Sequence, residues 1–150
     1  MWGQSMGNAT RRLWSGALLT AACLLTADTA AAEGALAVGW TGDVAKDGLA
    51  VGTAINYATR EQAIATAIEY CRKYDQAPRA KVNCKLVATF RRECYAVAYD
   101  PKAGTPGAGW AVAADKATAE ERAIAKCEAS AGTDRQGTCR TEEAKCDTND

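Results

Sequence analysis

Six of the seven cysteines fall into two sets of three that repeat one pattern along the chain. In each set, a residue suited to cap a helix lies twelve positions before the first cysteine, Thr59 before Cys71 and Asp115 before Cys127. The two sets are Cys71, Cys84 and Cys94, and then Cys127, Cys139 and Cys146. A duplicated unit that is cross-linked by disulfides explains this register.

The first 32 residues have the three parts of a cleavable signal peptide. Arg11 and Arg12 supply positive charge, residues 13–25 form a short apolar stretch, and residues 30–32 are all alanine, which a signal peptidase accepts. We therefore expect cleavage after Ala32. We expect no membrane span in the mature chain, because a spanning helix needs about 20 apolar residues.

The seventh cysteine, Cys23, lies inside this leader and would be removed with it. The alternative is lipidation of Cys23. Thr20 occupies the position three residues before it, where a lipoprotein signal would carry a large aliphatic residue, and so the sequence favours simple cleavage.

The expected mature chain, residues 33–150, has the size of one small domain. Without Arg11, Arg12 and Asp28, the 18 basic and 18 acidic residues become 16 and 17, a net charge of −1. This balance gives no general attraction to nucleic acid, and export makes nucleic acid a poor candidate partner. Alanine is abundant and large aliphatic residues are scarce, so we expect a thin core that disulfides supplement.

Apolar stretches and turn residues divide the mature chain into two β-β-α-β units, 33–94 and 95–146, followed by a short acidic tail at 147–150 that we expect to fray. The apolar stripes of the two helices stand 56 positions apart without a gap. The predicted strands are 34–40, 49–55, 85–90, 95–99, 109–113 and a weaker one from residue 140; the helices are 59–71 and 115–127. We expect one α+β domain with both helices packed on a mainly antiparallel sheet.

The helix-end cysteine of each unit is a candidate partner for the next cysteine of that unit. The two closing cysteines would then pair across the two units. These candidate pairs are Cys71–Cys84, Cys127–Cys139 and Cys94–Cys146. Six cysteines allow fifteen connectivities, and the sequence leaves the others open.

In the order and spacing of several short motifs, nearly the whole mature chain resembles the exported bacterial domain-of-unknown-function family 4189. The motifs are Gly34-Ala-Leu-Ala-Val, Ala58-Thr-Arg-Glu-x-Ala63 leading to Cys71, Cys84-x-Leu-Val-x-x-Phe90 leading to Cys94, Tyr95-Ala-Val-Ala, and Gly109-Trp110. The second helix departs from the pattern, with Asp115-Lys116 where the family shows Thr-Arg, yet Asp115 still provides a cap. The resemblance implies a secreted or periplasmic disulfide-rich domain and supplies no catalytic residues.

The residue inventory offers little chemistry. The chain has no histidine, which excludes Ser-His-Asp and Cys-His catalysis and histidine-based metal sites. No close cysteine pair suggests zinc or a thioredoxin-like site, and Ser130 has no obvious base. Capping explains the carboxylates Asp43, Asp47, Glu61, Asp100 and Asp115 without catalysis. We therefore expect no catalytic residue, no metal and no cofactor.

Two features suggest a surface for a partner. Between Arg72 and Arg92 lie seven basic residues opposed only by Asp75, which indicates either a solvated face or a patch for an anionic partner. Trp40 and Trp110 either pack on the sheet beside the helices or form a paired aromatic surface. The candidate partner surface is Trp40, Trp110, Arg91 and Arg92.

Taken together, these observations favour an exported binding or interaction module of the periplasm or the extracellular space, without enzymatic activity. Its partner would be an envelope or extracellular protein or polymer. One alternative is a carboxylate-dependent hydrolase of the cell envelope, which would need two convergent acidic side chains. The other is a secreted effector.

Overall fold

The structure, a computed structural model, describes residues 32–147 and contains two successive strand-strand-helix-strand units. The first unit consists of β1 (Glu33–Gly39), α1 (Val44–Asp47), β2 (Ala50–Tyr57), α2 (Arg60–Arg72), η1 (Lys81–Asn83) and β3 (Lys85–Phe90). The second consists of β4 (Cys94–Tyr99), β5 (Ala108–Ala113), α3 (Lys116–Ala131), η2 (Thr133–Arg135) and β6 (Arg140–Cys146). The predicted leader lies outside the described residues, apart from Ala32.

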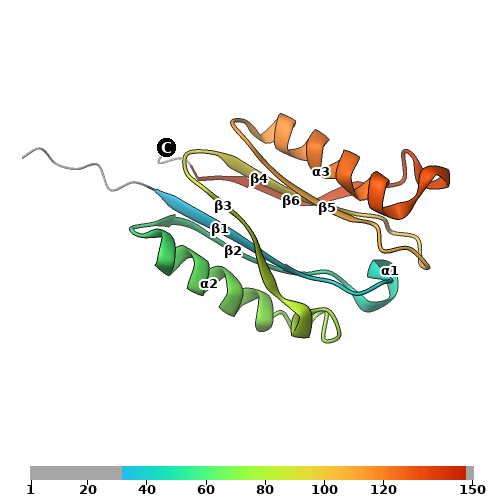
Figure 1. The fold of residues 1–150 in the computed structure, drawn as a ribbon, viewed down its shortest axis with the longest axis horizontal. Coiled ribbons are helices and arrows are strands. Elements are labelled where there is room, and N and C mark those ends of the chain that lie inside the picture. The colour runs from blue at the N-terminus through green and yellow to red at the C-terminus, as the bar shows by residue number, and fades with distance from the viewer. Residues whose placement is uncertain (1–31, 148–150) are drawn as a thin grey trace, which may run out of the picture.

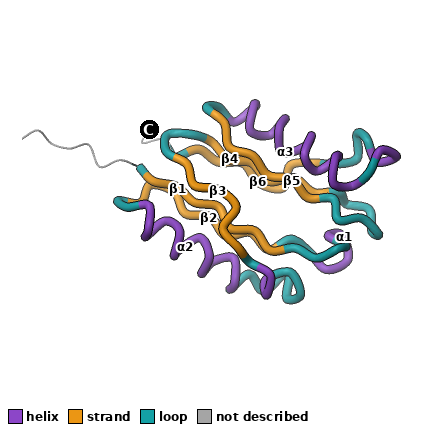
Figure 2. The backbone as a smooth tube through the Cα atoms, in the orientation of Figure 1, coloured by secondary structure: helices purple, strands orange, loops and turns teal. Residues whose placement is uncertain are grey.

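The strands form two antiparallel three-stranded sheets, with the orders β2-β1-β3 and β5-β4-β6. Helix α2 packs on the outer face of the first sheet and α3 on the outer face of the second, and the inner faces of the sheets lie toward each other (Figure 1). The layers therefore run helix, sheet, sheet, helix, which the tube in Figure 2 also shows. The predicted α+β class is confirmed, but the strands divide into two sheets where we expected one. A single helical turn, α1, occupies the connection between the predicted strands 34–40 and 49–55.

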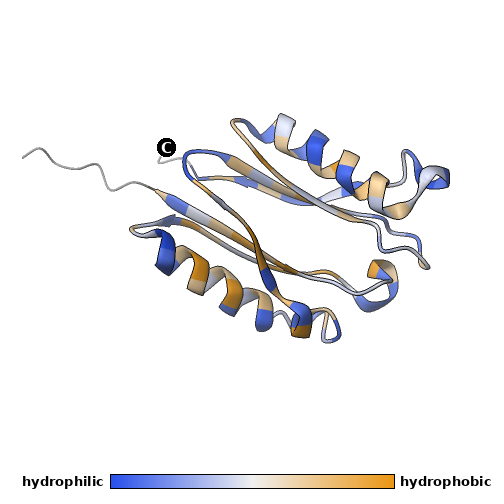
Figure 3. Cartoon of the chain, in the orientation of Figure 1, coloured by the Kyte–Doolittle hydropathy of each residue, from blue (hydrophilic) through white to orange (hydrophobic). Residues whose placement is uncertain are grey.

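Both long helices begin at the predicted caps. The Thr59 side chain accepts a hydrogen bond from the Gln62 amide at 3.3 Å, and the Asp115 side chain accepts one from the Thr118 amide at 2.9 Å. These bonds satisfy backbone donors that the first helical turn leaves free. The hydrogen bonds from the Thr118 amide and hydroxyl lower the pKa of Asp115. Hydrophobic and hydrophilic residues alternate along both helices (Figure 3), as one-sided packing requires.

Residue size alternates along the two central strands. In β1 the alanines lie against α2, whereas Leu36 and Val38 face the second sheet. In β4 the alanines lie against α3, whereas Tyr95 and Val97 face the first sheet. Successive side chains of a strand point to opposite faces, so this alternation lets the helices approach closely while large side chains fill the space between the sheets. Full burial of each large side chain contributes about 1.5–3 kcal/mol.

One glycine in each unit marks the point where the helix lies closest to its sheet. A Cβ atom added to Gly52 would lie 2.0 Å from the carbonyl oxygen of Ala67, and one added to Gly109 would lie 2.2 Å from that of Ala123. Real Cβ atoms do not come this close to backbone atoms. Each helix therefore packs directly against strand backbone, at equivalent places in the two units.

The six cysteines of the described chain form three disulfides, and the pairs are the three that we favoured: Cys71–Cys84, Cys94–Cys146 and Cys127–Cys139. Our expectation that one of them crosses between the units is wrong. Cys94 is the first residue of β4 rather than the end of the first unit, and it lies directly opposite Cys146 in the same sheet. The first unit therefore has one disulfide, the second has two, and among residues 32–147 none joins the units.

Candidate binding cleft between the two units

The two units meet in a buried apolar layer between the sheets, which we call the seam. It consists of Leu36, Val38, Val44, Leu49, Phe90, Tyr95, Val97 and Ala108. Trp40 and Trp110 pack against the seam and against each other, with ring centroids 4.8 Å apart. Because no disulfide of the described chain crosses it, the seam holds the units together through packing and a few hydrogen bonds.

One of these hydrogen bonds uses a buried carboxylate. The backbone amide of Asn56, near the end of β2, donates to Oδ1 of Asp147 at 2.6 Å. Asp147 is fully buried, and its own amide donates to the carbonyl of Glu93 at 2.8 Å. Asn56 has a φ of 61°, a left-handed conformation that asparagine tolerates better than most residues. Our expectation that the acidic tail frays from residue 147 is therefore wrong for Asp147; residues 148–150 lie outside the described chain.

A second buried carboxylate organises the connection between β4 and β5. Both oxygens of Asp100 accept hydrogen bonds from the guanidinium of Arg135, at 2.8 Å from Nε and 2.6 Å from Nη2. Burial by itself raises the pKa of Asp100, but the hydrogen bonds from Arg135, the Lys102 amide and Thr105 outweigh burial and lower it. The carboxylate is thus charged and paired, which fixes the connection that leads into the seam.

Beyond that connection, the two units line an open cavity of about 320 Å³ at one edge of the seam, which we call the seam cleft. Neither unit alone contains it, because each contributes one wall. The first unit contributes Leu49, Tyr74 and Gln76 to its lining, and the second contributes Tyr99, Arg140 and Glu142.

Tyr99 and Arg140 form a preorganised pair on the second wall of the seam cleft. They lie opposite each other on β4 and β6, and the guanidinium carbon of Arg140 lies 5.0 Å from the centroid of the Tyr99 ring. Nε of Arg140 donates to the Tyr99 hydroxyl at 3.1 Å, and Nη2 donates to the same oxygen. A guanidinium has five N–H donors, so this geometry orients Arg140 and leaves further donors for another group.

The seam cleft also holds a carboxylate. Glu142 lines it together with Tyr74. Burial raises the pKa of Tyr74, and the negative charges of Glu142 and Glu143 raise it further. Glu143 pairs with Lys145 at 2.5 Å. Within residues 32–147, Glu142 has no such ion pair. Glu142 is therefore available to bind a ligand.

The other unit repeats the stacked cation but not the rest of the seam cleft. Lys85, like Arg140, follows a disulfide cysteine and opens the last strand of its unit, and its ammonium lies 4.6 Å from the centroid of the Trp40 ring. The hollow beside it is built by the first unit alone and has no carboxylate; its lining is Trp40, Thr41, Gly42, Asn83 and Lys85. The repeated cysteine–cation pair is a signal visible in the sequence, but the sequence patterns do not identify Tyr74, Arg140 or Glu142 as candidate site residues.

The structure separates the candidate partner surface into two parts. Trp40 and Trp110 lie together, whereas Arg91 and Arg92 form part of the turn between β3 and β4. Arg91 lies 3.8 Å from the carboxylate of Glu33, which begins β1, and Trp40 follows the end of that seven-residue strand, so the two parts are roughly 20 Å apart.

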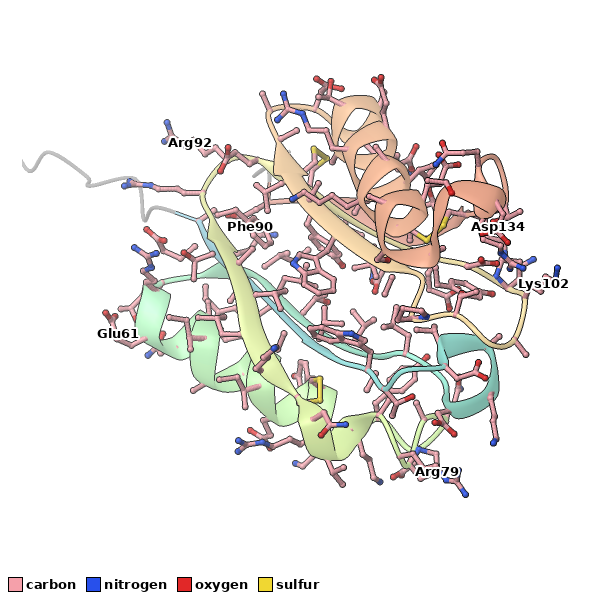
Figure 4. All side chains as sticks on the ribbon, turned by 45° about the vertical axis from the view of Figure 1, so that its right-hand side comes forward. Glu61, Arg79, Phe90, Arg92, Lys102 and Asp134 are labelled. Carbon is pink, nitrogen blue, oxygen red and sulfur yellow. A yellow bond between two sulfur atoms is a disulfide. The ribbon has the colours of Figure 1, made fainter. Side chains whose placement is uncertain are left out.

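The seven basic residues between Arg72 and Arg92 do not form one patch. Arg79 and Arg92 lie at different ends of the molecule (Figure 4). Several of the seven are neutralised by acidic neighbours; the pairs are Lys73–Glu69, Arg79–Asp47, Lys81–Asp75 and Arg91–Glu33. This stretch therefore gives less local positive charge than the sequence suggests.

No helix in residues 32–147 is long and apolar enough to cross a membrane. In the same residues, no three histidine, cysteine or acidic side chains gather in a way that could hold a metal ion.

A family profile matches residues 34–146, and its description is a domain of unknown function, DUF4189. The chain belongs to this family. The match confirms the resemblance that the motifs indicated. The DUF4189 chain is also similar to a solved structure, the NMR structure of Rv1813c from Mycobacterium tuberculosis. The two share 19% identity, with 96% of this chain and 98% of that chain covered and a TM-score of 0.42. No curated protein matches the chain.

Proposed function

We propose that this DUF4189 chain is an exported, disulfide-bonded binding module that holds its ligand in the seam cleft. The observation that carries the proposal is the seam cleft itself, which both units build and in which Arg140 is oriented and Glu142 is unpaired within the described chain. Its volume of about 320 Å³ lies within the range of small-ligand pockets, and polar groups provide most of its exposed lining.

Export is supported by the oxidised cysteines and by the leader. Stable disulfides form in oxidising compartments, such as the periplasm and the extracellular space. The first strand begins at Glu33, directly after the predicted cleavage position. Mass spectrometry of protein recovered from periplasmic and culture-medium fractions should give a fully oxidised chain that begins at Glu33. A chain found only in the cytoplasm with its leader intact would refute export.

Binding fits the seam cleft better than hydrolysis does. Glycoside hydrolysis by carboxylates uses a pair of acidic residues flanking the scissile bond. The lining of the seam cleft includes one acidic residue, Glu142. The nearby Asp47 lines a neighbouring hollow, where it accepts a hydrogen bond from Thr41 at 2.8 Å and pairs with Arg79.

Site-specific photo-cross-linking tests the location of binding. A photoreactive residue replaces Gln76, which is exposed and lines the seam cleft, and a matched control replaces Glu121, which is exposed on α3. Capture of the same envelope or extracellular species at position 76, and not at 121, would support the proposal. Equal capture at both positions, or none in any fraction, would contradict it.

The turn that carries Arg91 and Arg92 remains our second proposed contact surface. Both side chains are exposed, and charge reversal at both positions should weaken capture if an anionic partner docks there. Unchanged capture after reversal would exclude this surface and leave the seam cleft.

A further inference from the structure

The seam cleft offers the two kinds of contact that a sugar ring needs. Leu49 and the rings of Tyr74 and Tyr99 give it apolar surface, while Arg140 and Glu142 add strong hydrogen-bonding groups. A pyranose has an apolar C–H face and a rim of hydroxyl groups, and each hydroxyl both donates and accepts. We propose that the seam cleft binds a neutral saccharide unit of an envelope or extracellular glycan. This rests on the proposed function and names its ligand class.

The charges of the seam cleft favour a neutral ligand. Arg140 would attract an anion, but Glu142, two residues along the same strand, would repel it. A cation would meet the reverse combination. A neutral polyhydroxylated ring can instead donate to the Glu142 carboxylate and accept from the Arg140 guanidinium, and hydrogen bonds to charged groups are among the strong ones.

Two polar groups of the seam cleft, Arg140 and Gln76, are held in place by tyrosine hydroxyls before any ligand arrives. The Tyr99 hydroxyl fixes the guanidinium of Arg140, and the Tyr74 hydroxyl donates to Oε1 of Gln76 at 3.3 Å. Each bond reduces the side-chain freedom that binding would otherwise remove. Hydroxyl groups spaced around a rigid ring need partners that are fixed in this way.

The volume of the seam cleft limits the length of the ligand. About 320 Å³ lies near the lower end of small-ligand pockets, which span roughly 300–1,000 Å³. This space suits one or two sugar rings, so we expect recognition of a terminal or short unit. A longer glycan would continue past Pro101 and Ala45, which line the seam cleft and are exposed.

The first unit supplies a matched control. Lys85 stacks on Trp40 as Arg140 stacks on Tyr99, but the hollow beside Lys85 is lined by the first unit alone and its lining includes no acidic residue. The substitution Lys85→Gln therefore removes an equivalent stacked cation without touching the seam cleft. If Arg140→Gln weakens sugar binding and Lys85→Gln does not, the loss comes from a contact in the seam cleft and not from the removal of a stacked cation in general.

The test is an NMR titration of the purified, oxidised protein with glucose, mannose, galactose, N-acetylglucosamine, maltose and N,N′-diacetylchitobiose. At least one sugar should shift backbone signals around Tyr74, Tyr99 and Arg140 at concentrations up to about 10 mM, a range that detects weak binding. Arg140→Gln and Glu142→Gln should each weaken that binding about tenfold or more. Lys85→Gln should leave it unchanged.

The proposal is overturned if no sugar of the panel shifts these signals, or if both cleft variants bind as the parent does. It is also overturned if glycine or acetate, added as zwitterionic and anionic probes, binds there more tightly than every sugar. Cross-linking at position 76 separates this failure from failure of the proposed function. Capture there without sugar binding would leave a binding module with another ligand, and no capture would refute both.

Discussion

The close contact between Gly52 and α2 makes a single methyl group a severe perturbation. In Gly52→Ala, the new Cβ would lie 2.0 Å from the carbonyl oxygen of Ala67 and 2.2 Å from the amide nitrogen of Cys71. Ordinary contact begins at 3.4 Å, so α2 would have to retreat by about 1.4 Å, the difference between 3.4 and 2.0 Å. Neither obstacle is the flexible end of a side chain, so no rotamer change relieves the clash.

The cost follows from what that retreat would open. Ala63, Ala67 and Cys71 are fully buried between α2 and the sheet, and a gap of 0.5–1 Å forfeits about a quarter to a half of a dispersion contact. The disulfide of Cys71 with Cys84 also ties the end of α2 to the start of β3. Overpacking costs about 1–3 kcal/mol, and we expect Gly52→Ala to reach about 3 kcal/mol. For a domain of this size, that lowers Tm by roughly 10 °C.

Thermal and urea unfolding of the oxidised protein measure this effect. Gly42→Ala is the matched control, because a Cβ at Gly42 meets nothing within 4 Å and its backbone is outside the left-handed region. The control should stay within about 0.5 kcal/mol of the parent. Gly109→Ala, the equivalent change in the second unit, should resemble Gly52→Ala. An unchanged Tm for Gly52→Ala would refute the close packing of helix on strand.

Three further predictions concern the buried carboxylates and the seam. Arg135→Met should cost about 3–5 kcal/mol near neutral pH, because it strands the Asp100 carboxylate. The difference in unfolding free energy between the parent and Arg135→Met should shrink below about pH 4, because the parent there loses the stability that the lowered pKa of Asp100 provides. Urea unfolding near pH 7 and below about pH 4 measures this difference, and an equal difference at the two pH values would contradict the prediction. Asp147→Ala should lower the free energy of unfolding in urea by about 2 kcal/mol, because it removes the hydrogen bond from the Asn56 amide. Glu121→Ala is the neutral control, and an Asp147→Ala variant as stable as this control would show that the hydrogen bond does not stabilise the fold. The third variant carries a specific protease site inserted after Arg92. Cleavage of the oxidised protein should give two fragments that separate on a non-reducing denaturing gel. Fragments that separate only with reductant would reveal a disulfide between the units.

Local patterns in the sequence predicted the units well. Thr59 and Asp115 cap the helices, and the helix-end cysteines pair with the next cysteine of their own unit, because these contacts join residues close in the chain. The predicted pairing of Cys94 with Cys146 is also confirmed, but this disulfide lies within the second unit and does not link the two units as we expected. Assigning Cys94 to the end of the first unit made the pair look like a link between units, while β4 in fact begins at that residue.

The division into two sheets and the position of the seam cleft were harder to predict. Strand periodicity shows that β1 has two buried faces, but not that one of them packs on a second sheet. The size difference between Ala37 on one face and Leu36 on the other was the available signal. The seam cleft joins residues from both units, such as Tyr74 and Arg140, and no local pattern brings them together.

The absence of a disulfide across the seam, within the described chain, bears on how such a fold could originate. At the seam β3 lies beside β5, and the end of β2 is hydrogen-bonded to Asp147, the residue after β6. Because β2 is equivalent to β5 and β3 to β6, each of these contacts becomes the other when the two units are exchanged. That is the contact pattern of a two-fold homodimer whose copies have been fused through the short turn at residues 91–93. A homodimer must alter its two equivalent hollows together. A fused pair can elaborate one hollow with residues of both units, as at Arg140 and Glu142, while the hollow beside Trp40 is lined by the first unit alone and has no carboxylate.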